Sequence, residues 1–188
     1  MTANKFSYRW KLSELKPPAP DAPKVFSCFA CGGGSSMGYK LAGYDVIGCN
    51  EIDPRMARHY MRNLKPKYHF IEPIQDFKLR DDFPEELYSL DILDGSPSCS
   101  TFSMSGNREK DWGRKKHFRE GQQAQVLDTL FFDFIDLAKK LQPKVVIAEN
   151  VKGMLIGEAV DYVIRIREEL EEAGYYVQHF LLNAAKMG

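Results

Sequence analysis

The sequence predicts an α/β protein with a doubly wound, mostly parallel sheet and helices on both faces. Short apolar runs typical of strands alternate with segments whose apolar residues recur at the helical period, as in consecutive βαβ units. Several of the apolar runs end in glycine, acidic or amide residues, and open α/β sheets bind ligands beyond the carboxyl ends of their strands. Strands are expected at residues 24–30, 44–51, 68–71, 90–95, 144–150 and 175–183.

Helices are expected between these strands. Asp53 and Pro54 suit the N-cap and the first turn of one of them, and Pro143 ends another. The 144–150 run is nearly continuous in apolar residues, which predicts a strand that is covered on both faces. The helical segments are 31–43 (entered through a glycine turn), 53–64, 122–141 and 158–174.

Length and composition are those of one globular domain with an appendage. Residues 1–23 end in "LKPPAPDAP" and are expected to form an extended, proline-rich arm, while residues 24–188 form the domain. Lys and Arg total 26, as do Asp and Glu, so binding to a polyanion would depend on local clusters of charge. The chain has no apolar run of membrane-spanning length and no signal-peptide pattern, so a cytoplasmic location is expected, with no membrane partner.

The four cysteines, Cys28, Cys31, Cys49 and Cys99, are too few and too irregularly spaced for a disulfide framework. Cys28 and Cys31 form a C-x-x-C pair, but no second pair of ligands follows it. A structural zinc ion needs such a second pair, so no metal site is predicted.

The glycine turn and the acid that follows it predict a nucleoside cofactor. Gly32, Gly33, Gly34 and Gly38 permit a tight turn and close approach of the backbone to a ligand, although a purely structural turn uses glycines too. Glu51 lies 17 residues after Gly34, near the spacing at which an acid accepts hydrogen bonds from ribose hydroxyls. The dinucleotide pattern G-x-G-x-x-G is missing, which disfavours a nicotinamide-dependent oxidoreductase.

Two further strand ends carry unusual residues. "DGSPSCSTFS" (94–103) places Cys99 in a loop of small and hydroxyl residues, which is a poor place to bury a structural thiol. Glu149 and Asn150 end the 144–150 run, where a helix cap is the simpler interpretation of either residue alone. If the two strand ends share one cleft, they bring a thiol and a carboxyl group together there.

Together these segments resemble the DNA (cytosine-5)-methyltransferases, over residues 24–188. "FSCFACGGGSSMG" looks like the first motif, "NEIDPRMARHYMRN" the second, "DGSPSCSTFS" the fourth, "AENVKGML" the sixth, and "AGYYVQHFLLNAAKMG" the seventh. The resemblance implies a Rossmann-like sheet that binds S-adenosyl-L-methionine. The residues it implies for the cofactor are Phe29, Ala30, Gly32, Gly33, Gly34, Glu51 and Ile52, with either Glu72 or Asp76 as the acid near the adenine.

The resemblance also implies the reaction, a methyl transfer to carbon 5 of cytosine in double-stranded DNA. Cys99 would be the nucleophile and Glu149 would grip the base, while Pro97 and Asn150 would shape the site. The target base would have to flip out of the duplex.

Residues 104–123 contain six basic and three acidic side chains and are expected to close on DNA, although a solvated loop has the same composition. The expected DNA-binding residues are Ser103, Arg108, Arg114, Lys115 and Lys116.

Several positions depart from the family pattern. Ser27 stands in place of an acid, Cys31 in place of a glycine and Ser98 in place of a proline. The family's eighth motif, target-recognition region and last motif would follow residue 188. We therefore expect an incomplete catalytic domain that binds the cofactor weakly, is inactive alone, and relies on a C-terminal fragment or second chain for target recognition. The alternatives are an RNA cytosine-5 methyltransferase and a non-catalytic, cofactor-binding scaffold.

Overall fold

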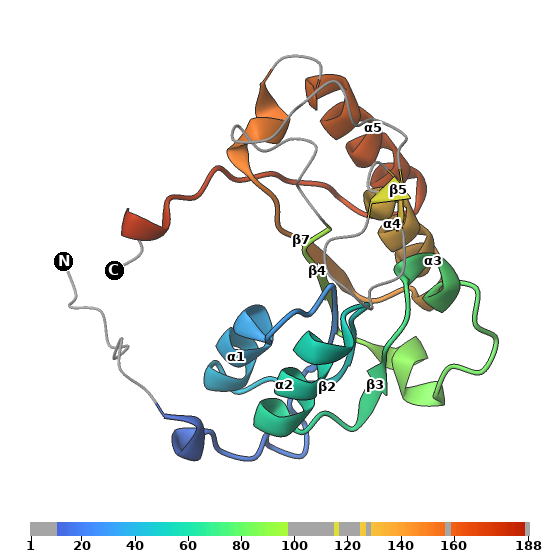
Figure 1. The fold of residues 1–188 in the computed structure, drawn as a ribbon. Helices are drawn as coiled ribbons and strands as arrows, with labels where there is room; N and C mark the ends of the chain where they lie inside the picture. The colour runs from blue at the N-terminus through green and yellow to red at the C-terminus, as the bar shows by residue number, and fades with distance from the viewer. Residues whose placement is uncertain (1–10, 98–114, 117–124, 127–128, 157–158, 187–188) are drawn as a thin grey trace.

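The computed structural model describes residues 11–97, 115–116, 125–126, 129–156 and 159–186, and its centre is a parallel sheet (Figure 1). The strand order is β3-β2-β1-β4-β7, and every pairing in this sheet is parallel, so the predicted fold class is confirmed. A separate antiparallel pair is formed by two two-residue strands, β5 and β6. The bounds are β1 Lys24–Cys28, β2 Asp45–Asn50, β3 Tyr68–Phe70, β4 Ile92–Gly95, β5 Lys115–Lys116, β6 Gln125–Val126 and β7 Val145–Ala148.

Helices cover both faces of the sheet, as predicted, with α1 and α2 grouped apart from α4 and α5 (Figure 1). The Asp53 carboxylate caps α2 by accepting a hydrogen bond from the Arg55 N–H at 2.8 Å, and Pro54 follows at the first position. The helix expected over 122–141 begins only at Leu130. The helices are α1 Gly34–Leu41, α2 Pro54–Leu64, α3 Ile74–Phe77, α4 Leu130–Leu141 and α5 Ala159–Glu172, and short 3-10 turns cover Leu12–Glu14, Glu85–Ser89, Lys152–Leu155 and Ala184–Lys186.

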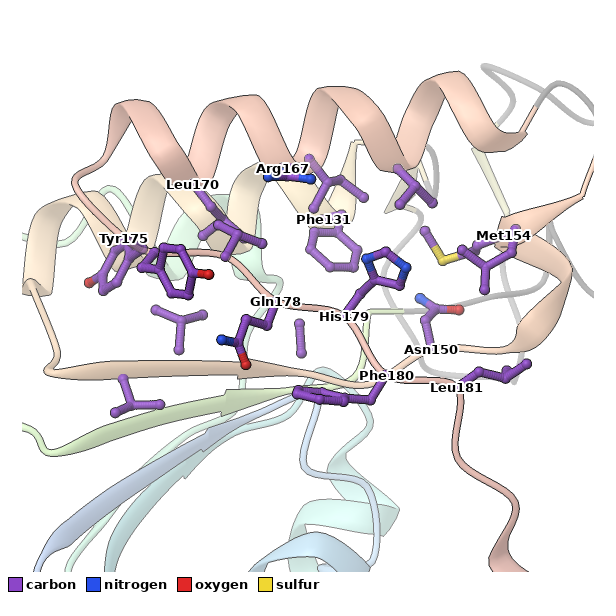
Figure 2. Close-up of a pocket in the computed structure, with 18 of the residues that line it drawn as sticks. Phe131, Asn150, Met154, Arg167, Leu170, Tyr175, Gln178, His179, Phe180 and Leu181 are labelled. Atoms are coloured by element: carbon purple, nitrogen blue, oxygen red, sulfur yellow. The ribbon is translucent and has the colours of Figure 1, made fainter.

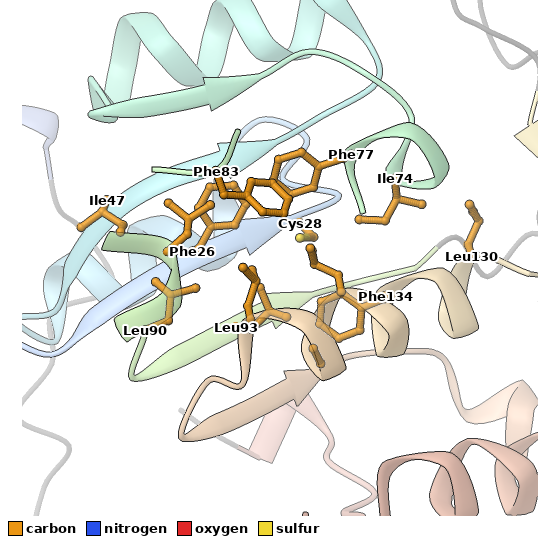
Figure 3. Packing of buried hydrophobic residues seen from close by; sticks show 14 residues of the cluster. Phe26, Cys28, Ile47, Ile74, Phe77, Phe83, Leu90, Leu93, Leu130 and Phe134 are labelled. Carbon is orange, nitrogen blue, oxygen red and sulfur yellow. The ribbon is translucent and has the colours of Figure 1, made fainter. Parts of the chain in front are cut away.

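The main core lies between the sheet and the helices α3 and α4 (Figure 3). Phe26 of β1 stacks on Phe77 of α3 with ring centroids 5.6 Å apart, and Phe134 of α4 is fully buried. Gly95 makes room for this packing, since a Cβ atom there would lie 2.6 Å from Cε2 of Phe134. The core therefore fixes β4 against α4 through the close contact of a glycine and an aromatic ring.

The carboxyl-terminal part of the domain departs from the sequence predictions. The 144–150 run was expected to be covered on both faces, but β7 is the edge strand of the described sheet, and Val145 and Ile147 are 47% and 39% exposed. The strand expected at 175–183 is not formed, because these residues have no strand partner in the described part of the chain. A strand needs a hydrogen-bonded neighbour, and an apolar pattern does not supply one.

The proline-rich arm is described only from Lys11, and its one regular element is the turn at Leu12–Glu14. None of the helices in the described ranges combines the length and apolar character needed to span a membrane.

Candidate functional site

The turn between β1 and α1 is built from residues in the left-handed region of the backbone map. Phe29, Cys31 and Gly33 have φ angles of 52°, 45° and 91°. The other non-glycine residues with positive φ in the described ranges, Lys65 and Gln142, are C-caps of helices, where this conformation is common. Left-handed conformation of non-glycine residues costs about 1 kcal/mol or more each and gathers at ligand sites. The turn is therefore a candidate for ligand binding on backbone geometry alone.

The three glycines of this turn have different roles. A Cβ atom on Gly33 would lie 2.5 Å from Cδ1 of Leu64 and 3.0 Å from the ring of Tyr60, so Gly33 is required for packing against α2. Gly32 and Gly34 are exposed, and a Cβ atom on either would meet nothing within 4 Å. Gly33 thus allows the turn to pack closely against α2, while Gly32 and Gly34 leave open space beside the backbone that a ligand could approach.

Glu51, the predicted ribose acid, lies against the glycine turn. One carboxylate oxygen accepts a hydrogen bond from the Cys31 N–H at 2.6 Å, and the other accepts one from the Asp53 N–H at 2.7 Å. Burial raises the pKa of Glu51, and the two backbone hydrogen bonds act in the opposite direction. Each oxygen keeps a further lone pair, so the carboxylate can accept from two hydroxyl groups of a ligand as well.

Other residues predicted for the cofactor lie around the same strand ends. Phe29 is partly buried, and its ring packs against Phe134 with a centroid distance of 6.2 Å. Ala30 is buried toward α1 and α2, so only its backbone remains to meet a ligand. Ile52 is partly exposed just beyond Glu51.

The two candidates for the acid near the adenine differ in their surroundings. The Glu72 carboxylate forms an ion pair with the Arg80 guanidinium at 3.0 Å, and the Glu72 carbonyl oxygen accepts a hydrogen bond from Nδ2 of Asn50 at 2.9 Å. Asp76 lies in α3 and is exposed. Asn50 was not predicted, although its side chain ties the end of β2 to the segment after β3; its signal in the sequence was an amide directly before Glu51.

A second unpredicted residue is Asp94, near the carboxyl end of β4. Its carboxylate is buried and accepts hydrogen bonds from three hydroxyl groups, those of Ser27, Ser35 and Tyr39. Ser27 is also its register partner on β1. The signal in the sequence was an acid between the apolar residues Ile92 and Leu93 and the glycine that ends the strand.

The ends of β4 and β7 meet, as the predicted catalytic site requires. The Glu149 N–H donates to the Gly95 carbonyl at 3.0 Å, and Nδ2 of Asn150 donates to the Pro97 carbonyl at 3.1 Å. Pro97 is buried, while Glu149 is exposed. Cys99, the predicted nucleophile, lies outside the described residues. Pro97, the last described residue after β4, precedes it by two positions in the sequence.

The predicted DNA-binding residues Ser103, Arg108 and Arg114 also lie outside the described residues. The backbone of Lys115 and Lys116 forms β5, which pairs with β6. The side chains of these two residues lie outside the described structure.

Two of the described cysteines are poor nucleophiles. Burial raises the pKa of Cys49 to about 12, with a smaller contribution from the Glu51 carboxylate. The pKa of Cys28 is also raised, chiefly by burial. A thiol attacks as the thiolate, so these two side chains are inert at neutral pH.

Figure 2 shows the larger of the described clefts, whose lining includes no residue of the glycine turn. It has a volume of about 460 Å³ and is lined by β7, by α5 and by the segment 175–181. Phe131, Met154 and Leu170 form part of its apolar wall, and Asn150 is the one predicted site residue that borders it. A smaller hollow of about 360 Å³ lies beside Gly32–Gly34.

Comparison with known proteins shows the family of the chain. The family profile described as C-5 cytosine-specific DNA methylase matches residues 23–188. The chain belongs to this family. The relationship predicted from the motifs is therefore confirmed, as is S-adenosylmethionine as the methyl donor of the family.

Among curated relatives, the type II methyltransferase M.FnuDI of Fusobacterium nucleatum is 34% identical over 165 residues, which cover 88% of this chain and 43% of the relative. M.NgoPII of Neisseria gonorrhoeae is also 34% identical, over 94% of this chain and 47% of its own length. The chain thus spans about half the length of these relatives. In a solved structure, a protein encoded within an Escherichia coli prophage and provisionally described as a DNA modification methyltransferase has the same fold (TM-score 0.58, 23% identity, 80% of this chain and 38% of that chain).

Proposed function

We propose that this chain forms the cofactor-binding and catalytic half of a DNA (cytosine-5)-methyltransferase, which transfers a methyl group from S-adenosylmethionine to carbon 5 of cytosine. The meeting of the β4 and β7 ends carries the proposal, because it joins the loop leading to Cys99 to the segment of Glu149 and Asn150. The glycine turn and Glu51, at the neighbouring ends of β1 and β2, form the adjoining cofactor site.

Each predicted catalytic residue has one task. The Cys99 thiolate adds to carbon 6 of the cytosine, which makes carbon 5 nucleophilic enough to take the methyl group. Glu149 donates a proton in a hydrogen bond to N3 and stabilises the ring as the sulfur adds. Asn150 holds Pro97, and therefore the start of the cysteine loop, at 3.1 Å through its side-chain amide. Loss of the carbon-5 proton and expulsion of the cysteine sulfur restore the aromatic ring.

The substrate is double-stranded DNA from which the target cytosine is flipped, since a stacked base cannot reach a strand-end cleft. Ser103, Arg108, Arg114, Lys115 and Lys116 contact the DNA in this proposal. Basic contacts of this kind bind phosphates, so they would weaken as the salt concentration rises.

Target recognition comes from a further polypeptide, either a continuation of this chain or a second chain. The chain spans about half the length of its relatives, and β7 is a partly exposed edge of the described sheet, beside an apolar cleft. Both features suit the addition of more sheet and more core at this side. We expect the 188 residues alone to bind the cofactor weakly and to be inactive.

Covalent trapping tests the proposed function. The chain, alone and fused to the part of M.FnuDI that it does not match, is incubated with S-adenosylmethionine and a DNA duplex containing 5-fluorocytosine. The fluorine blocks the final elimination, so the enzyme stays attached to the DNA and migrates as an adduct on a denaturing gel. We expect the adduct with the fusion, its loss in Cys99→Ala, and its retention in Cys49→Ala, whose thiol is buried.

Two results would contradict the proposal. An adduct that persists in Cys99→Ala would remove Cys99 as the nucleophile. Absence of any adduct from a folded fusion that binds the cofactor would support a non-catalytic scaffold, and an adduct formed only on RNA would change the substrate. Efficient methylation by the 188 residues alone would contradict the expected inactivity.

A further inference from the structure

Two buried carboxylates flank the glycine turn, and neither has a cationic partner among the described residues. Glu51 holds the entering side of the turn through the Cys31 N–H, and Asp94 holds the leaving side through the Ser35 hydroxyl. Their exposed fractions are 8% and 5%. Asp133, also buried, shows the usual arrangement, since Lys78 lies 2.7 Å from its carboxylate. Buried carboxylates are normally paired, so the absence of cations beside this turn requires an explanation.

Within the described ranges, the donors to the Asp94 carboxylate are all neutral. The Ser27 hydroxyl donates to Oδ2 at 2.9 Å, the Ser35 hydroxyl donates to the same oxygen, and the Tyr39 hydroxyl donates to Oδ1 at 3.2 Å. These hydroxyl groups solvate the carboxylate but do not neutralise it, so its charge acts on the surrounding space. Among the described residues, Oδ1 accepts a hydrogen bond from the Tyr39 hydroxyl alone, and this bond is longer than the one from Ser27.

The charge on Asp94 affects the pKa of side chains on three neighbouring elements. It contributes to the raised pKa of Cys28 on β1, of Tyr39 on α1 and of Tyr60 on α2, after the larger effect of burial in each case. The Ser35 hydroxyl that donates to Asp94 lies directly after Gly34 and is exposed, so the same negative charge acts at the glycine turn, where it favours positive charge on a ligand. The carboxylate thus gives the cofactor side of the sheet a negative potential.

We propose that Asp94 is a specificity-determining residue that favours the sulfonium form of the cofactor over the uncharged thioether product. The proposal rests on the proposed function, because it assigns the glycine turn to S-adenosylmethionine. Methyl transfer converts the sulfonium to the thioether of S-adenosylhomocysteine and leaves the ammonium, carboxylate, ribose and adenine of the ligand unchanged. The two ligands therefore differ by one positive charge and one methyl group at the sulfur. A negative potential at this site assists the exchange of product for fresh cofactor.

A purely structural role for Asp94 predicts a different result. The residue also ties β1, β4 and α1 together, so its loss could disturb the turn and weaken the binding of any ligand. Such a disturbance would lower the affinity for both ligands by a similar factor. The ratio of the two dissociation constants isolates the effect of the charge.

Isothermal titration of the full chain with S-adenosylmethionine and with S-adenosylhomocysteine tests the inference. In Asp94→Asn, which keeps the shape and loses the charge, we expect the affinity for S-adenosylmethionine to fall about tenfold more than that for S-adenosylhomocysteine, as one Coulombic contact in a partly buried site would give. Asp91→Asn is the matched control. Asp91 lies at the other end of β4, paired with Lys144 at 2.6 Å, and its loss should leave the ratio unchanged. A ratio in Asp94→Asn that matches the wild type within twofold would overturn the inference.

A double exchange covers the case in which Asp94→Asn fails to fold. Ser27→Asp combined with Asp94→Ser moves the carboxylate to the register partner on β1, and the two residues already share a hydrogen bond. We expect this variant to keep the wild-type ratio, and a ratio shifted toward S-adenosylhomocysteine would overturn the inference. If the wild-type chain binds neither ligand, the proposed cofactor site itself is wrong. Binding of both ligands with no charge effect removes only the role of Asp94.

Discussion

The strands β1 and β7 have similar apolar sequences but very different surroundings. Val25 and Phe26 of β1 are fully buried, because β2 and β4 flank the strand and helices cover both of its faces. Val145 and Ile147 of β7 are partly exposed, because β7 has only β4 as a neighbour in the described sheet. The comparison shows that burial depends on neighbouring elements and not on the apolar character of the strand itself.

The same contrast extends to the elements around the two strands. The glycine turn beside β1 is held by two carboxylates and by the packing of Gly33 against α2. Beside β7, the segment after α5 carries Tyr176 and Phe180 at 87% and 73% exposure. The glycine turn is thus held by contacts within the described chain, while the β7 side presents apolar surface suited to a further polypeptide.

The largest expected effect compares a core residue with an edge residue. Phe134→Ala removes a fully buried ring that contacts Gly95 and Phe29, and it should lower the free energy of unfolding by about 3–5 kcal/mol. Ile147→Ala on β7 should cost less than about 1 kcal/mol, because the side chain is already partly in water. Urea denaturation followed by circular dichroism measures both. Equal losses would show that β7 is as well covered as the centre of the sheet.

A smaller effect separates two glycines that share the same backbone conformation. Gly33 and Gly174 have φ angles of 91° and 94°, but only Gly33 has side chains within 4 Å of a Cβ atom. Gly33→Ala should cost about 3 kcal/mol, from left-handed strain and from the clash with Leu64, whereas Gly174→Ala should cost about 1 kcal/mol, from strain alone. Thermal unfolding of the two variants tests this difference. A cost for Gly174→Ala equal to that for Gly33→Ala would contradict the open surroundings of Gly174.

The smallest effect is a dependence of stability on pH, with opposite signs at two glutamates. The folded-state pKa of Glu51 is raised by burial, so its contribution to stability is present below the usual value of 4.5 and is lost as the pH rises through the raised pKa. The pKa of Glu86 is lowered to about 2, chiefly by hydrogen bonds from Lys67 and Lys24, so its contribution is present above 4.5 and is lost as the pH falls toward 2.

Glu51→Gln and Glu86→Gln separate these contributions. The stability of the wild type relative to Glu51→Gln should fall as the pH rises, and its stability relative to Glu86→Gln should fall as the pH decreases. Urea midpoints measured between about pH 3 and pH 8 give both trends, over the range in which carboxylates titrate. Trends of the same sign would show that burial does not dominate at Glu51.

Much of the region around the glycine turn could be predicted from the sequence, because its signals are local. Asp53 and Pro54 mark the start of α2 by the chemistry of a helix cap, and the glycine turn with Glu51 after it marks two strand ends. The motif resemblance adds the pairing of the 94–97 loop with Glu149 and Asn150, and the structure shows these segments in contact.

Predictions failed where an element needed a partner from elsewhere in the chain. The 175–183 segment has the composition of a strand, but no strand in the described residues pairs with it. The sequence by itself determined the parallel α/β fold, the glycine turn and the family, because these depend on the order of local patterns. Only the tertiary structure decided that β7 is an exposed edge and that Asp94 faces Ser27, Ser35 and Tyr39. Both depend on contacts between residues far apart in the chain, and a local pattern does not specify its neighbours.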